Sequence, residues 1–413
     1  MTLFAPLQLQ IHTMPASPHH PTSLAIFCKV VDNYGDIGIC YRLARQLQRE
    51  HGVAVTLWVD DLGSFHRICP ALDPDADTQQ VEHVTVRHWR GQASPFTPQE
   101  VADIVIEFFA VDIPDTYIQA MAQRAAQGMA RPVWLNLEGL SAEAWVEGCH
   151  RLPSMHPRLP LTKHFFFPGF TDKTGGLLRE AGLGEARRAF QSEPHAIATF
   201  LEELGVTPAE TAQQKVSLFC YPGAPVAALF NAWQHGASGL TCLVPQGVAT
   251  QAVENFLGAP ATAGAAATRG ALSVRVVPFV SQQEYDKLLW ACDLNFVRGE
   301  DSFVRAQWAG RPFVWHIYPQ DENLHHVKLR AFLQRYAPDN EALQALSLRW
   351  NGAFDNPLQE TRTWPELWSQ LHAAAPHMAP HCVAWEQRMQ ALGDLASNLL
   401  TFATSVQADA PKN

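Results

Sequence analysis

The sequence predicts an α/β protein made of two doubly wound units, each a mainly parallel β-sheet with helices on both faces. Two observations support this prediction. Short apolar runs that suit strands alternate with longer runs of helical periodicity, and this alternation occurs twice along the chain. The chain also has 413 residues, which is too long for one ordinary hydrophobic core. Hydrophobic residues make up 47% of it, as is typical of a globular protein.

The first unit begins with an apolar run at residues 24–31, followed by a loop rich in aspartate and glycine. A helix is expected at 37–50, where Ile39, Leu43 and Leu47 recur every four positions. The next expected elements are strands at 53–59, 81–89 and 103–109, a helix at 113–127, a strand at 132–137, a short buried strand at 165–167, a helix at 194–204 capped by Ser192, and a polar connection at 207–214.

The alternation starts again at residue 215. The expected strands of the second unit are residues 215–221, 240–244, 274–280, 294–297 and 313–317. The expected helices are residues 225–235, 249–257, one that follows the capping box from Ser281 to Glu284, one that begins near Glu300, and others toward the end, while 261–270 is expected to be a loop. The predicted parts are a disordered leader at 1–22, Rossmann-like domains at 23–212 and 213–385, and a C-terminal helix returning to the first domain with a tail at 386–413.

Composition excludes several classes of protein. The net charge of −10 argues against a nucleic-acid surface, which needs clustered basic residues. We find no apolar run of ~18 residues, so no membrane span is expected. The first basic residue is Lys29, which does not suit a signal peptide, and none of the eight cysteines forms a CxxC pair. A soluble, cytoplasmic protein with free thiols is therefore expected.

The first candidate motif runs from Asp32 to Gly38, at the carboxyl end of the first strand, where open α/β sheets bind ligands. Glycines 35 and 38 allow a tight turn into the helix, but two carboxylates would repel a pyrophosphate. Asp32 and Asp36 suit a cationic acceptor or a general base instead. The alternative is that one of them only caps the helix.

The second candidate motif runs from Arg298 to Arg305, where a strand ends, Gly299 turns the chain and a helix begins. The backbone N–H groups there and the charge of Arg298 suit an anion, although Asp301 and Ser302 would also serve as helix caps. A third candidate is Phe219 with Tyr221, which period two places on one strand face where a flat base can lie. Core packing is the alternative for both rings.

Metal sites find little support in the sequence. The acidic triplet Asp73, Asp75 and Asp77 lies in a Pro-containing stretch away from any strand end, which favours a solvated loop. His325 and His326 are adjacent on a helix and point to different faces. No metal site is expected.

Together these stretches resemble one family, the protein-arginine rhamnosyltransferases that modify translation elongation factor P. The resemblance covers most of residues 24–400, and three blocks carry it: 26–38, 298–307 and 315–323. It implies a GT-B fold with two Rossmann-like domains facing a cleft, a cytoplasmic enzyme, and elongation factor P as the protein partner. It further implies dTDP-β-L-rhamnose as co-substrate, no cofactor or metal, and inversion at the sugar carbon.

The resemblance also assigns roles to matching positions. It implies that Asp36 is the general base, that Glu300 is a second essential carboxylate, and that Asp32 and Asp36 bind the acceptor. The residues implied in donor binding are Asn33, Tyr34, Gly35, Phe219, Tyr221, Gln282, Arg298, Gly299, Asp301 and Ser302. One departure is Gly139 after Glu138, where the family is expected to have tyrosine.

Two rival functions stay open at this stage. One is a glycosyltransferase of the same fold that acts on lipopolysaccharide or a small acceptor, although the basic or amphipathic membrane-facing helix expected of it is not found in the sequence. The other is a non-catalytic partner of the translation factor that only binds a nucleotide sugar.

Overall fold

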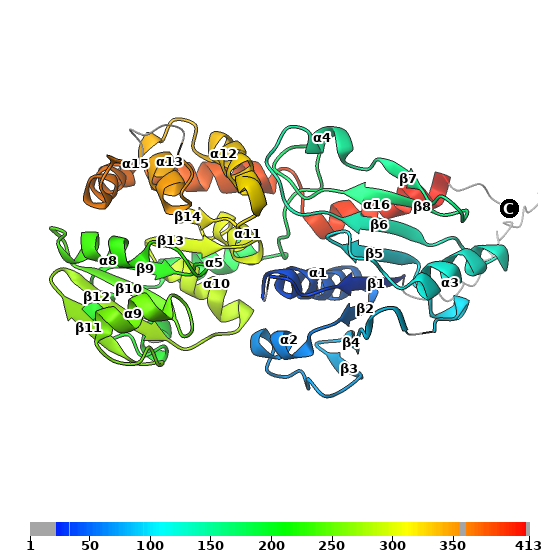
Figure 1. Cartoon of the computed structure of the whole chain (residues 1–413), viewed down its shortest axis with the longest axis horizontal. Helices are drawn as coiled ribbons and strands as arrows, with labels where there is room; N and C mark the ends of the chain where they lie inside the picture. Colours follow the sequence, from blue (N-terminus) through cyan, green and yellow to red (C-terminus); the bar gives the residue numbers. More distant parts are fainter. Residues whose placement is uncertain (1–21, 33, 94, 355–360, 410–413) are drawn as a thin grey trace, which may run out of the picture.

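The computed structural model describes residues 22–409 except 33, 94 and 355–360. Two β-sheets lie side by side along its long axis, each with helices packed against it (Figure 1). The sheet of the N-terminal half has eight strands and the other has six. The predicted leader at 1–22 and the tail after 409 lie outside the described residues, apart from Thr22.

The first sheet has the strand order β3-β4-β2-β1-β5-β6-β8-β7. Its strands are β1 (Ser23–Cys28), β2 (Ala54–Val59), β3 (Thr78–Val81), β4 (Val84–His88), β5 (Ile104–Phe108), β6 (Val133–Leu137), β7 (Pro153–Met155) and β8 (Thr162–Phe166). The central strands pair in parallel and are almost wholly apolar and buried, because helices cover both faces. The helices of this half are α1 (Gly35–His51), α2 (Leu62–Ile68), η1 (Gly91–Ala93), η2 (Pro98–Glu100), α3 (Asp115–Ala126) and α4 (Val146–Cys149).

The second sheet has the order β11-β12-β10-β9-β13-β14. Its strands are β9 (Gln214–Leu218), β10 (Leu240–Pro245), β11 (Ala266–Arg269), β12 (Leu272–Val277), β13 (Leu294–Arg298) and β14 (Phe313–His316). The remaining helices are α5 (Leu183–Ser192), α6 (Pro194–Glu203), α7 (Pro208–Thr211), α8 (Val226–Gln234), α9 (Thr250–Leu257), α10 (Gln282–Ala291), α11 (Asp301–Gln307), η3 (Asp321–Asn323), α12 (Leu324–Tyr336), α13 (Glu341–Trp350), α15 (Trp364–Gln390) and α16 (Leu395–Asp409).

Helix α1 is buried along most of its length. The twelve residues from Asp36 to Leu47 are all buried, although only one face of the helix reads as apolar in the sequence. Its apolar side packs on β1 and β2, and its other sides meet α11 of the second half and α16 of the C-terminus. A helix buried on every side must satisfy its polar side chains inside the protein, which matters for the site.

The C-terminal helix α16 returns to the first sheet. It packs against β6 and α1, and a bridge between Leu177 and Asp394 precedes it (Figure 1). Helix α1, near the start of the sequence, and helix α16, near its end, are therefore in contact. The predicted domain boundaries near residues 212 and 385 stay predictions.

Several elements differ from the sequence-based expectation. Residues 81–89 form the turn and second strand of the antiparallel hairpin β3–β4, because Glu82 and His83 both adopt positive φ. The expected loop at 261–270 contains β11, which pairs antiparallel with β12. Ser192 ends α5 and does not cap α6, whose N-cap is Glu193. The expected connection at 207–214 contains α7, which a capping box between Thr207 and Glu210 starts.

Candidate active site

Two of the predicted motifs meet in space. The loop after β1 and the loop after β13 face each other across the two halves, because the carboxyl ends of both central strands point into the same cleft. Two adjoining cavities lie there. The wider one has a volume of ≈ 390 Å³ and is lined by Asp32, Asp36 and Glu300 among others, and the narrower one is lined by Phe219, Arg298 and Tyr285 among others.

Asp36 lies in the first turn of α1, and 5% of it is exposed. Its Oδ2 accepts hydrogen bonds from the backbone N–H groups of Val31 and Asp32 at 2.7 and 2.8 Å. Burial raises the pKa of Asp36. Gly35 is needed beside it, since a Cβ there would lie 2.7 Å from Asp32 Oδ2. The side chain of Asp36 is thus fixed by its own loop and lines the wider cavity.

Asp32 connects the two halves. The Tyr221 hydroxyl of the second half donates a hydrogen bond to its Oδ2. Burial raises the pKa of Asp32 to about 6, and the hydrogen bond from Tyr221 opposes that rise. Gly299 has a φ of 60°, and a Cβ there would lie 2.7 Å from both Asp32 Oδ2 and the Tyr221 hydroxyl, so glycine permits this contact.

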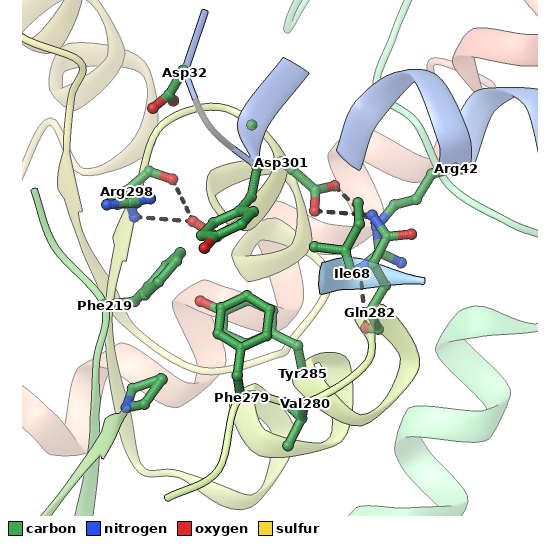
Figure 2. Close-up of a pocket in the computed structure, with 14 residues that line it drawn as sticks. Asp32, Arg42, Ile68, Phe219, Phe279, Val280, Gln282, Tyr285, Arg298 and Asp301 are labelled. Atoms are coloured by element: carbon green, nitrogen blue, oxygen red, sulfur yellow. Dashed lines mark hydrogen bonds and ion pairs between the residues drawn. The ribbon is translucent and has the colours of Figure 1, made fainter. Parts of the chain in front are cut away.

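Arg298 lies between two rings. Its guanidinium carbon is 4.5 Å from the centroid of the Phe219 ring and 4.7 Å from that of Tyr221. We expected Phe219 and Tyr221 to share one face of a strand, and this is wrong because β9 ends at Leu218. The two residues follow the strand, and both rings contact the guanidinium of Arg298. Figure 2 shows Phe219, Tyr285 and Phe279 gathered around the narrower pocket, with Arg298 next to Phe219.

Ser302 and Tyr34 complete parts of this region. Ser302 Oγ accepts from the Arg298 backbone N–H at 2.9 Å and also bonds the Arg298 carbonyl, which fixes the turn before α11. The Tyr34 hydroxyl accepts from Arg67 at 3.0 Å, and the Tyr34 ring lies 5.0 Å from Phe279 across the pocket. Asn33, a predicted donor contact, lies outside the described residues.

Gln282 and Asp301 bridge the two halves. Gln282 Nε2 donates to the Gly38 carbonyl at 3.0 Å, and its Oε1 accepts from Arg45 at 3.0 Å. Asp301 Oδ1 accepts from Arg42 Nε at 2.9 Å, as Figure 2 shows. Both residues line the narrower pocket, so the predicted donor positions are held in place by helix α1. Sequence reasoning missed both arginines, because a helical arginine is most often exposed.

Glu300 reaches into the wider cavity from the start of α11. Its Oε1 accepts from the Leu140 backbone N–H at 3.0 Å, and burial raises its pKa to about 8. Gly139 lies beside it, and a Cβ there would be 3.5 Å from Glu300 Oε2. Glu138 and Lys328, which sequence reasoning did not assign to the site, also line this cavity.

Comparisons with known proteins identify the family. The profile of the family described as "Elongation-Factor P (EF-P) rhamnosyltransferase EarP" matches residues 24–404. The chain belongs to this family. A protein-arginine rhamnosyltransferase of Pseudomonas putida is 48% identical over 383 residues, which cover 91% of this chain and 97% of that one. One of Shewanella oneidensis is 40% identical over 387 residues, covering 91% and 96%.

A solved structure supports the fold. The structure described as "Structural basis for EarP-mediated arginine glycosylation of translation elongation factor EF-P" is 34% identical, with a TM-score of 0.61, and the match covers 93% of this chain and 99% of that one. The EarP family and the GT-B fold expected from the sequence are confirmed. The protein is a glycosyltransferase with two Rossmann-like halves facing a cleft.

Two further findings concern metals and membranes. Among the residues that the structure describes, no three His, Cys, Asp or Glu side chains are grouped as metal ligands. Asp77 of the acidic triplet forms an ion pair with Arg90. No described helix combines the length and apolar character needed to cross a bilayer.

Proposed function

We propose that this EarP-family protein transfers L-rhamnose from dTDP-β-L-rhamnose to an arginine side chain of elongation factor P in the cytoplasm, with inversion at the sugar carbon and without a metal. One observation carries the proposal. Four acidic side chains, those of Asp32, Asp36, Glu138 and Glu300, line a cavity together with Lys29 and Lys328, and this cavity adjoins an arginine that lies against two rings. A cationic acceptor fits the first part and an anionic nucleotide fits the second.

The acceptor chemistry explains the carboxylates. A guanidinium stays protonated near neutral pH and is a poor nucleophile, so it needs a base that removes a proton as its nitrogen attacks. Asp36 is suited to this role because two backbone N–H groups hold its Oδ2, which leaves Oδ1 for the acceptor. As the nitrogen bonds to the sugar carbon, the carbon–oxygen bond to dTDP breaks and its electron pair leaves with the diphosphate.

The donor chemistry explains the narrower pocket. Arg298 supplies a full positive charge where the diphosphate develops negative charge. Phe219 and Tyr285 lie with their ring centroids 5.8 Å apart beside it, and they offer apolar surfaces to thymine. Glu300 lines the wider cavity beside Asp36, and this place supports a role in holding sugar hydroxyls or the acceptor.

The pH dependence follows from Asp32. Because the pKa of Asp32 is about 6, its carboxylate is ionised above that pH and neutral below it. We expect kcat/KM to rise with pH through about 6 as Asp32 ionises, while Glu300, whose pKa burial raises to about 8, is still neutral. Tyr221→Phe removes a hydrogen bond that lowers this pKa, so the rise should move to higher pH. A rise centred near the ordinary aspartate value of ~4 in both proteins would contradict this assignment.

Metal removal should leave the activity intact, because Arg298 supplies the positive charge that a metal would otherwise bring to the diphosphate. We expect the same initial rate in excess EDTA and in added magnesium. Loss of activity in EDTA that magnesium or manganese restores would contradict the metal-free proposal.

One experiment separates the proposal from its rivals. The protein is incubated with dTDP-β-L-rhamnose and purified elongation factor P, and intact masses are recorded. The proposal predicts a gain of one deoxyhexose on the factor. A gain on another acceptor alone would favour a GT-B enzyme of different specificity. Donor binding without any transfer would favour a non-catalytic partner.

A further inference from the structure

Helix α1 carries two arginines into the boundary between the halves. Arg42 has a side chain that is 1% exposed, and Arg45 has one that is 9% exposed. Both side chains are largely shielded from water, so their charges must be balanced inside the protein. Arg45 pairs with Glu82 of the first half and donates to Gln282 of the second, whereas Arg42 pairs with carboxylates of the second half. Their partners therefore show how the halves are joined.

Arg42 makes a set of contacts with the second half. Its Nε donates to Asp301 Oδ1 at 2.9 Å, and its two terminal nitrogens donate to the two oxygens of Asp286 at 3.1 Å each. Nη2 also donates to the Gln282 carbonyl at 3.0 Å. One planar side chain of the first half thus holds the starts of both α10 and α11.

Other residues hold these partners in place. Arg305 donates to both oxygens of Asp286 at 2.9 and 2.7 Å and to Glu180 at 2.6 Å. Burial favours the neutral form of Glu180, yet Arg305 and Arg42 together lower its pKa to about 2. Glu180 is therefore ionised, and in this cluster the three carboxyl groups of Asp286, Asp301 and Glu180 share the two guanidinium groups of Arg42 and Arg305.

The cluster lies close in sequence to Asp36 and Glu300, the two carboxyl groups assigned to the reaction. Asp36 is six residues before Arg42 on α1, and Glu300 is the residue before Asp301. Gly38 permits the close approach, since a Cβ there would lie 3.0 Å from Asp301 Oδ2. The bond from Arg42 to Asp301 therefore joins the helix that carries the base to the turn that carries Arg298 and Glu300.

We propose that Arg42 is a positioning residue that sets the distance between the base on α1 and the donor-binding turn before α11. This rests on the proposed function, in which Asp36 and Arg298 act in one reaction. A buried ion cluster gives little stability that a packed apolar side chain would not, whereas its fork geometry fixes orientation. Asp301 then contributes to donor binding through the position of its turn.

The test compares Arg42→Met and Arg42→Lys with Arg187→Met. Arg187 forms a similar buried ion pair with Glu386, lines neither of the two cavities, and serves as the matched control. A misplacement of about 1 Å can cost on the order of 10² in rate, so both Arg42 variants should lose at least about tenfold more in kcat than in dTDP affinity. Arg187→Met should melt at a lower temperature with an unchanged kcat.

The opposite outcomes overturn the proposal. If kcat and dTDP affinity fall by the same factor in both Arg42 variants, or if neither falls, Arg42 is only structural. If Arg42→Met does not fold, Arg42→Lys decides, because it keeps the charge and loses the fork. If the unaltered protein transfers no rhamnose, the proposed function fails separately. In that case hydrogen exchange of backbone amides tests the role of Arg42 without activity. Exchange at residues 35–42 and 301–307 should be faster in the Arg42 variants than in the control, and unchanged exchange would contradict the inference.

Discussion

Asp36→Asn is expected to lower the rate of rhamnosyl transfer by about 10²–10⁴, because the variant cannot accept a proton from the attacking nitrogen. The amide oxygen can still accept a hydrogen bond from Val31 or Asp32, so the loop should keep its shape. Asp36 lines the wider cavity, away from Phe219 and Arg298, and dTDP affinity should therefore change little. Initial rates and dTDP calorimetry on the same preparation measure both quantities.

Asp60→Asn is the matched control for this variant. Asp60 Oδ1 accepts from the Val30 N–H at 2.8 Å, so it also anchors the loop after β1. The Asp60→Asn variant should transfer rhamnose at close to the rate of the unaltered protein. Near-normal turnover by Asp36→Asn would show that Asp36 is not the base.

The second large effect is expected on donor binding. Arg298→Ala removes a charged contact to the diphosphate, which is worth roughly 1.5–3 kcal/mol, or about 10- to 150-fold in the Kd for dTDP. Arg269→Ala is the control, since Arg269 also lies over a ring, that of Phe256 at 5.2 Å, but on β11 away from the cleft. Equal dTDP affinities for Arg298→Ala and the unaltered protein would place the diphosphate elsewhere.

The sequence predicted the parts of the site that depend on strand ends. Asp36 and Arg298 were singled out because each follows a buried strand with glycine nearby, and parallel strands bring such ends together. The contact of Asp32 with Tyr221 was not predictable, because periodicity describes each half and not how the halves meet. Arg42 was missed for the same reason, since helix α1 reads as a surface helix and is buried only by the second half and α16.

The antiparallel edge strands were missed for a different reason. β3, β7 and β11 are only three or four residues long and mostly polar or exposed, so they carry no apolar run that would reveal them. Each pairs only with the strand beside it in the sequence. Their absence from the prediction did not affect the site, which lies at the central strands.

The most direct test of the proposed chemistry is the structure of the reaction product. Elongation factor P is treated with the protein and dTDP-β-L-rhamnose, and the product is analysed by tandem mass spectrometry and by NMR of the anomeric carbon. A single displacement by an arginine nitrogen predicts one rhamnose on an arginine side chain, in the α configuration. A β-linked sugar, a sugar on another residue type, or an unmodified factor would contradict it.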